Sequence, residues 1–263
     1  MITVEDVRVV FNPGTVLETV GLDGISLTLE PGQMVTVIGS NGAGKSTLLN
    51  VIAGDVMASR GRIAVDGQDV TRWSQERRAA LVARVFQDPL AGSFESLTIE
   101  ENLAIAGRRG RHRGFGLAID NRAREGFRQE LAGLGLGLEH RLGERMDRLS
   151  GGQRQAVSLL ATCLAPTKLL LLDEHTAALD PKIAAFVLKL TDRLVTERNL
   201  TTLMVTHSMR QALDHGNRTI MLHEGKIVFD VSGEERERLD VADLVELFSQ
   251  RRGEALADDA LLL

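Results

Sequence analysis

Two short segments of this sequence carry residue types that could bind and attack a phosphate group. Residues 39–46 read GSNGAGKS and match the pattern G-x-x-x-x-G-K-[S/T] without a mismatch. In that pattern the glycines let successive backbone N–H groups turn toward phosphates, and the following helix directs its positive end at them. The residues expected to hold phosphate are Gly39, Ser40, Asn41, Gly42, Ala43, Gly44, Lys45, Ser46 and Thr47. Lys45 is expected to reach the β- and γ-phosphates, and the Ser46 hydroxyl to bind Mg²⁺.

The second segment is an apolar run that ends in two acids, LLLLDE at 169–174. A leucine run alone is usually core, but parallel sheets place ligands at the carboxyl ends of their strands. We expect Asp173 to hold the Mg²⁺ shell, mainly through water. Glu174 is expected to polarise the attacking water as general base.

These side chains need an α/β framework, and hydrophobic periodicity predicts one. Strands are predicted at 7–11, 25–29, 34–38, 168–173 and 203–206, and hairpins at 61–68 (turn Asp66-Gly67) and 219–229 (turn Glu224-Gly225). Helices are predicted at 46–53, closed by Gly54, at about 74–84, where residues 85–87 then form a strand end, and at 181–198. Strand–helix alternation implies a parallel sheet core, and the early hairpins an antiparallel edge.

Composition narrows the class of protein. The 263 residues carry a formal net charge of −5, which argues against a general nucleic-acid binder. No run approaches the roughly 18–20 apolar residues of a membrane span, and the first residues lack a secretory signal pattern. The single cysteine, Cys163, is expected to be a small buried core residue, and the cytosol is the expected compartment.

A third segment, LSGGQ at 149–153, lies between the phosphate loop and the acidic strand. Further motifs occur in order: VFQDP with Gln87, Ala178-Leu179-Asp180, and LMVTH ending in His207. In this order the motifs resemble those of the ATP-binding cassette (ABC) ATPases, over nearly the whole chain.

The resemblance assigns further roles. Gln87 would touch Mg²⁺ and the water, His207 would stabilise the γ-phosphate, and Asp180 would belong to a loop that crosses a dimer interface. The signature residues, which would grip the γ-phosphate of an opposite subunit, are Ser150, Gly151, Gly152 and Gln153. Phe11 is the only aromatic residue in the stretch where the family stacks adenine, although a strand phenylalanine is commonly core; Val16 or Val20 would pack beside it.

The resemblance also implies a fold and partners. The fold is a P-loop NTPase with a RecA-like parallel sheet, an N-terminal antiparallel β subdomain and an inserted helical subdomain. Residues 1–87 and 159–231 would form the nucleotide-binding core with the β subdomain, 88–158 the helical signature subdomain, and 232–263 a helical tail that caps the core and frays at its end. Two copies would meet head to tail around MgATP on the cytoplasmic face of the cell membrane. They would drive integral membrane permease subunits and, indirectly, a substrate-binding protein, with no nucleic acid.

Two features deviate from this pattern, and Trp73 lies outside its motifs. His175 replaces the proline that usually follows the catalytic glutamate, either as a tolerated loop substitution or as a second titratable group near the γ-phosphate. The basic run 108–113 is expected to be a solvated loop that faces a permease or anionic lipid, rather than a nucleic-acid site. Trp73 is expected to be half-buried.

The segments FNPGT, VFQDP and DEHTAALDP resemble the ATPases of bacterial uptake systems with a tryptophan/tyrosine-type binding protein. They favour import of a small solute such as an amino acid. An exporter ATPase and a soluble ABC ATPase on ribosomes or DNA remain alternatives, although the latter usually carries two cassettes or a long coiled coil. A small-molecule kinase and a binding module without turnover are disfavoured by LSGGQ and by Glu174.

Overall fold

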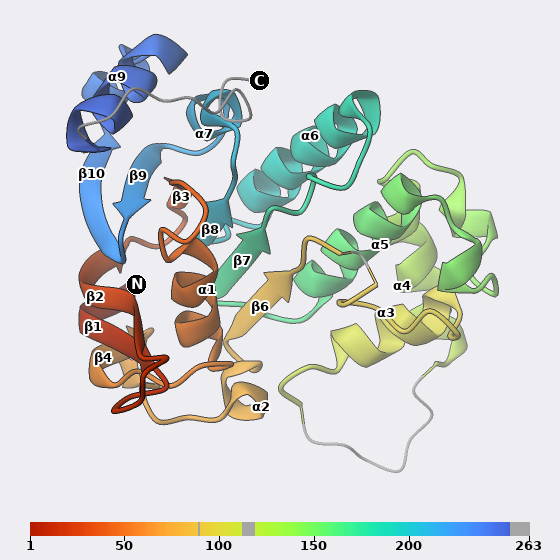
Figure 1. Cartoon of the computed structure of the whole chain (residues 1–263). Coiled ribbons are helices and arrows are strands. Elements are labelled where there is room, and N and C mark those ends of the chain that lie inside the picture. Colours follow the sequence, from red (N-terminus) through yellow and green to blue (C-terminus); the bar gives the residue numbers. More distant parts are fainter. Residues whose placement is uncertain (89, 112–118, 253–263) are drawn as a thin grey trace. The chain divides into compact units, whose positions relative to one another are not determined.

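The computed structural model describes residues 1–88, 90–111 and 119–252 (Figure 1). The chain divides into two compact units. The first unit is formed by Met1–Arg78 and Asn199–Leu263, and the second by Ala79–Arg198. The division into core, helical subdomain and tail given above remains a prediction.

The first unit contains an antiparallel sheet of order β2-β1-β4-β5. Its strands are β1 (Ile2–Phe11), β2 (Thr19–Leu29), β4 (Arg60–Val65) and β5 (Gln68–Asp69). Asp66 and Gly67 join β4 to β5, and both have positive φ (51° and 79°). Positive φ at both central residues is typical of the tight hairpin that an Asp-Gly pair favours, so the predicted turn is confirmed.

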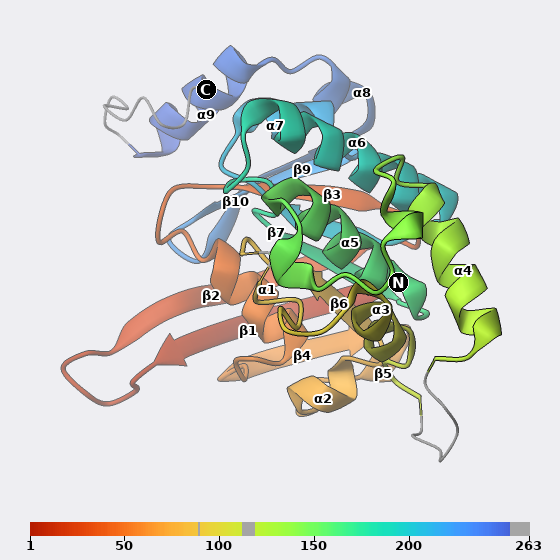
Figure 2. The same cartoon turned by 90° about the vertical axis from the view of Figure 1, so that its right-hand side faces the viewer.

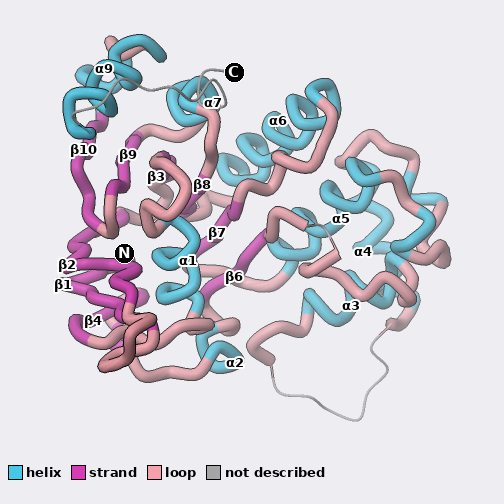
Figure 3. The backbone as a smooth tube through the Cα atoms, in the orientation of Figure 1, coloured by secondary structure: helices cyan, strands magenta, loops and turns pink. Residues whose placement is uncertain are grey.

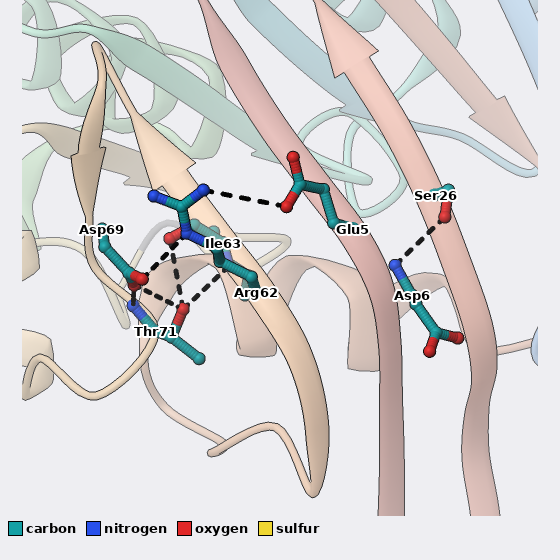
Figure 4. A network of polar contacts seen from close by, with 7 residues as sticks. All are labelled: Glu5, Asp6, Ser26, Arg62, Ile63, Asp69 and Thr71. Atoms are coloured by element: carbon teal, nitrogen blue, oxygen red, sulfur yellow. Dashed lines mark hydrogen bonds and ion pairs between the residues drawn. The ribbon is translucent and has the colours of Figure 1, made fainter.

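Polar side chains reinforce one end of this sheet (Figure 4). Arg62 of β4 pairs with Asp69 of β5 at 2.9 Å and reaches Glu5 of β1 at 3.8 Å. Asp69 also accepts hydrogen bonds from the Thr71 hydroxyl (2.6 Å) and backbone N–H (3.0 Å). The bonds from Thr71, followed by the one from Arg62, lower the Asp69 pKa to about 2.

The first unit also holds the strand that leads into the phosphate loop. That strand is β3 (Met34–Ile38), which pairs in parallel with β8 (Thr202–Val205) and β9 (Arg218–His223), while β10 (Lys226–Ser232) is antiparallel to β9. All five residues of β3 are buried, as is typical of a parallel strand covered on both faces. Helix α1 (Lys45–Ala53) follows β3 and ends at Gly54 in the left-handed conformation, as predicted.

Short helices complete the first unit: α2 (Gln75–Arg78), α7 (Met209–Asp214), α8 (Gly233–Glu237) and α9 (Val241–Arg252). Leu244 and Phe248 of α9 are buried in one cluster with Ile38 and Met221. Helix α9 therefore packs on the core of the first unit, and the last segment, ALADDALLL, lies outside the described residues.

The second unit is mainly helical apart from a parallel pair of strands, β6 (Val82–Val85) and β7 (Leu169–Asp173). Its helices are α3 (Ile99–Gly107), α4 (Asn121–Ala132), α5 (Gly151–Leu164) and α6 (Pro181–Glu197), with 3₁₀ turns at Leu138–His140 and Met146–Arg148. Helix α5 contacts α3, α4 and α6 (Figures 2 and 3). Within the described part of the chain, no helix has the length and apolar character needed to cross a membrane.

The predicted helix at about 74–84 is wrong beyond Arg78. Helix α2 ends there, and strand β6 begins at Val82, earlier than the strand end predicted at 85–87. The Arg78 side chain is fully buried and donates hydrogen bonds to the carbonyls of Val51 (2.5 Å) and Ile52 (3.0 Å) at the end of α1. Tertiary bonds and the pairing of β6 with β7 thus override local helix propensity.

Candidate active site

The phosphate loop leaves the carboxyl end of β3 and enters α1, as the motif requires. Gly39 has φ 152° and Gly44 has φ 102°. A Cβ on Gly39 would lie 2.3 Å from the Leu222 carbonyl oxygen, and one on Gly44 would lie 2.7 Å from that of Gly21. Both positions therefore require glycine because of conformation and space. Gly44 is the N-cap of α1 and supplies no side-chain cap, so the helix directs backbone donors and its positive end into the loop.

Lys45 is 5% exposed, and its ammonium group lies inside the loop. Nζ donates to the carbonyl oxygens of Gly39 (2.7 Å) and Ser40 (3.1 Å). A buried ammonium beside uncapped helix donors forms a cradle for a polyanion. Ser46 is exposed on the first turn of α1, next to half-buried Thr47. These residues lie at the start of α1, where the motif places them, and their contacts with ATP stay a prediction.

Phe11 lies beside the phosphate-loop helix. A Cβ on Gly21 would lie 2.6 Å from the Phe11 ring and 3.0 Å from the Thr47 methyl group, so the ring and the first turn of α1 meet at this glycine. Phe11 is half-buried, while Val16 and Val20 are 102% and 40% exposed. An aromatic face next to a phosphate cradle fits a nucleotide base.

His207 is half-buried between β8 and α7 in the first unit. The preceding residue holds this turn, because the Thr206 hydroxyl donates to Gln211 Oε1 (2.8 Å) and accepts from the Ser208 N–H (3.1 Å). Ser208 in turn caps α7. The histidine therefore stands on a fixed strand–helix turn, the position predicted for it.

In the second unit the two acids lie where β7 ends. Asp173 Oδ2 forms an ion pair with Arg84 Nη2 of β6 at 2.5 Å. Glu174 follows with φ 46°, a left-handed conformation that costs free energy for a residue other than glycine. Gln87, two residues after the end of β6, is exposed. Because β6 and β7 are parallel neighbours, Gln87, Asp173 and Glu174 emerge at the same edge.

The signature segment begins α5. Ser150 is exposed, and its hydroxyl accepts from the Gln153 N–H (3.3 Å) while Gln153 Oε1 accepts from the Ser150 N–H (3.2 Å). This reciprocal capping box starts a 14-residue helix whose first turn carries no acidic side chain. Its N-terminus is therefore suited to an anion.

The signature glycines face the start of α6. A Cβ on Gly152 would lie 2.2 Å from Ile183 Cγ2, whereas one on Gly151 would meet Leu179 only at 3.6 Å. Asp180 caps α6 by accepting from the Ile183 N–H (3.1 Å). The signature and the Asp180 loop are thus packed against each other within one unit.

His175 and the basic run 108–113 depart from the family pattern, and the structure gives them different surroundings. His175 is 2% exposed, and its ring Nε2 lies 2.9 Å from Thr191 Oγ1 of α6, a buried packing position. Within the basic run, Arg109 is not solvated as predicted, because it hydrogen-bonds the Thr162 carbonyl (3.1 Å) and the Thr167 hydroxyl, and burial lowers its pKa. His112 and Arg113 lie outside the described residues.

Two remaining expectations are confirmed. Cys163 is buried, and burial raises the pKa of its thiol to about 11, so it is unreactive at neutral pH. Trp73 is half-buried, with the Arg77 guanidinium 3.7 Å from its ring centroid.

Sequence reasoning missed Arg84, Gln155 and Thr191. Gln155 donates to the His175 carbonyl oxygen at 2.7 Å, and Thr191 holds the His175 ring. For Gln155 and Thr191 the available signal was a polar residue within a largely apolar helical segment, since Gln155 precedes Ala156 and Val157, and Thr191 follows Leu190.

Comparisons with known proteins agree with this geometry. The family model described as "ABC transporter" matches residues 22–177, more than half of the chain. The tyrosine transport ATP-binding protein of Clostridioides difficile (strain R20291) is 44% identical over 236 residues, which cover 90% of this chain and 92% of that protein. The thiamine import ATP-binding protein ThiQ of Yersinia pestis is 36% identical over 204 residues, 78% of this chain and 81% of that protein.

Solved structures match the fold. The ATP-binding cassette MJ0796, solved as a dimer in a post-hydrolysis state with ADP and Pi, has a TM-score of 0.75 and 25% identity, covering 88% of this chain and 98% of that one. A nucleotide-free cassette from an ABC transporter has a TM-score of 0.77 over 94% of this chain and 98% of that one. At 23% identity, that second likeness shows the fold alone.

A phosphate loop on a parallel strand, an acidic strand end and a capped signature helix define a P-loop ATPase that binds ATP. With the matches above, the chain belongs to the ABC transporter family.

Proposed function

We propose that the chain is the ATP-hydrolysing subunit of a bacterial importer of a small solute such as an amino acid. The observation that carries this proposal is 44% identity, over 90% of the chain, to a protein named for tyrosine transport. Relatives named for import of thiamine and phosphonates support the direction of transport.

Each of the predicted site residues has a separate role in ATP hydrolysis. Lys45 and the loop amides hold the phosphates, and Phe11 stacks on adenine. Glu174 polarises the attacking water as general base, with Gln87 orienting it and His207 stabilising the γ-phosphate. Catalysis then rests on positioning and charge neutralisation rather than on covalent chemistry.

The donors fit Mg²⁺. The Ser46 hydroxyl, the Asp173 carboxylate and the Gln87 amide all offer oxygen, which Mg²⁺ prefers, and Mg²⁺ is usually held by few protein groups together with substrate phosphates. Among the residues that the structure describes, no cluster of three His, Cys, Asp or Glu side chains is suited to a metal ion. When bound, Mg²⁺ neutralises charge on the phosphates.

The signature supports a head-to-tail homodimer. Ser150 is exposed at the positive end of α5, and its hydroxyl makes only a 3.3 Å bond to Gln153 N–H among the bonds described. A second copy would place its ATP phosphates on this helix end, with Asp180 lying at the shared interface. Each ATP would then need two chains.

A groove in the second unit offers a docking site for the permease. A hollow of about 310 Å³ is lined by residues that include Phe86, Phe94, Ile105 and Met146. Phe94 and Ile105 are 56% and 47% exposed, which is unusual for large apolar side chains and is typical of interaction surfaces. An amphipathic helix of a membrane subunit fits such a groove. Docking would hold the chain on the cytoplasmic face of the membrane.

The test is reconstitution with a permease and a substrate-binding protein, which are to be sought among the neighbouring genes. Vesicles that contain the complex should take up labelled tyrosine or tryptophan in an ATP-dependent manner, and Glu174→Gln should abolish uptake. Phe94→Asp with Ile105→Asp should prevent co-purification with the permease, whereas Met57→Asp, at an apolar residue of similar exposure (45%) in the first unit, should not. ATP-dependent export, or hydrolysis that no membrane subunit alters, would contradict the proposal.

A further inference from the structure

Glu174 holds a backbone conformation that its own residue type disfavours. Its φ of 46° lies in the left-handed region, which is unfavourable for a residue other than glycine. Such a conformation persists only when the surrounding structure fixes it. The next residue is His175 rather than a proline, so the turn after Glu174 is held by contacts with other parts of the unit.

His175 is held at two points. Its ring Nε2 lies 2.9 Å from Thr191 Oγ1 on α6, and its backbone carbonyl oxygen accepts from Gln155 Nε2 on α5 at 2.7 Å. His175 is 2% exposed, and Gln155 and Thr191 are fully buried. Helices on two sides therefore fix both the side chain and the main chain of the residue after Glu174.

The number of available protons determines which group donates in the bond between His175 and Thr191. The Thr191 hydroxyl donates its single proton to the Val187 carbonyl oxygen at 2.9 Å. It can therefore only accept from His175, so the ring donates through Nε2–H. Rotation of the ring would take this buried donor away from its acceptor, which is unfavourable.

Gln155 also reaches the loop that carries Gln87. Its Nε2 lies 3.4 Å from the Phe86 carbonyl oxygen, a long bond beside the short one to His175. One amide group therefore contacts the residue before Gln87 and the residue after Glu174. Gln87 and Glu174 are the two residues proposed to act on the attacking water.

We propose that Gln155 and Thr191 are positioning residues for hydrolysis, which hold His175 and thereby keep Glu174 in its strained, active conformation. The inference rests on the proposed role of Glu174 as general base. Neither residue touches ATP in this scheme, so both act on turnover and leave nucleotide affinity unchanged.

The test uses the full-length chain with the near-isosteric variants Thr191→Val and Gln155→Met. We expect kcat for ATP hydrolysis to fall about 10- to 100-fold, with the Kd for ATP within about twofold. Thr191→Ser should restore most of the rate. Thr162→Val is the matched control, because it removes the same kind of bond to a helix carbonyl, from Thr162 to Ser158 at 2.7 Å, away from His175. It should leave kcat unchanged.

The Glu174→Gln background separates positioning from packing. If Thr191 acts through Glu174, Thr191→Val should have no further effect on the residual rate of Glu174→Gln. Variants that melt at a lower temperature but hydrolyse ATP at the wild-type kcat per folded molecule would overturn the inference. Wild-type turnover by Glu174→Gln itself would instead overturn the base assignment on which it rests.

Discussion

Arg84 Nη2 and Asp173 Oδ2 form a 2.5 Å ion pair between neighbouring parallel strands, with side chains only 12% and 14% exposed. The Arg84 guanidinium also lies 4.7 Å from the Phe86 ring centroid. The proposed Mg²⁺ carboxylate is therefore neutralised by a protein cation when no metal is present. Arg84 thus compensates the charge at the acidic end of β7.

Arg84→Gln should destabilise the protein by roughly 1–3 kcal/mol, less than for a fully buried pair, because the Asp173 carboxylate loses its cation. Since Mg²⁺ would replace that charge, MgATP should raise the melting temperature of the variant more than that of the wild type. Arg145→Gln, which breaks an exposed pair with Asp147, is the control and should change stability little. An equal MgATP shift in all three proteins would argue against the metal role of Asp173.

Gly152→Ala should lower stability by about 1–3 kcal/mol through overpacking, because the new methyl group would lie 2.2 Å from Ile183 Cγ2. Gly151→Ala adds the same group 3.6 Å from Leu179, at ordinary contact distance, and should melt close to the wild type. Thermal unfolding of the two variants decides the point. Equal melting temperatures would show that the start of α6 shifts to accommodate the new methyl group without loss of stability.

Phe11→Ala should weaken ATP binding by about 5- to 100-fold, which corresponds to the roughly 1–3 kcal/mol of a base stacked on an aromatic ring. Phe11→Trp should retain most of the affinity. Titration calorimetry with ATP and with inorganic triphosphate distinguishes stacking from loss of the loop, since only ATP binding should change. Equal losses for both ligands would mean that the ring supports Gly21 and Thr47 instead.

Local signals in the sequence were sufficient wherever one short segment determines the geometry. Asp66-Gly67 predicted its hairpin and Gly54 the end of α1, because positive φ favours those residues. The phosphate loop and the acids at the end of β7 could also be placed from the sequence. Each is a contiguous motif whose backbone and side chains act together.

Features that join distant segments could not be predicted. The buried Arg78 bonds carbonyls 26 and 27 residues away, which ends α2 early. The Gln155–His175–Thr191 junction joins α5, the loop after β7, and α6. Nothing in the sequence around Arg109 indicates that its side chain binds the Thr162 carbonyl oxygen. Tertiary contacts determine the positions of these side chains, and local secondary-structure propensity carries no information about such contacts.

Glu174→Gln should bind ATP with wild-type affinity, lose hydrolysis by at least about 100-fold and accumulate an ATP-bound dimer, because the amide cannot accept the proton of the attacking water. Light scattering after gel filtration with ATP measures the dimer. ADP should leave the variant monomeric. Turnover at the wild-type rate would exclude Glu174 as the base.

Mixing two inactive variants tests the shared site most directly. Lys45→Ala disables the phosphate loop and Ser150→Phe blocks the signature, so neither chain alone should hydrolyse ATP. In a head-to-tail dimer of the two, one site combines the intact Lys45 with the intact Ser150, so an equimolar mixture should regain up to about a quarter of wild-type sites. Recovered ATPase activity is the predicted result. A mixture as inactive as its components, with dimers formed, would contradict a site built from two chains.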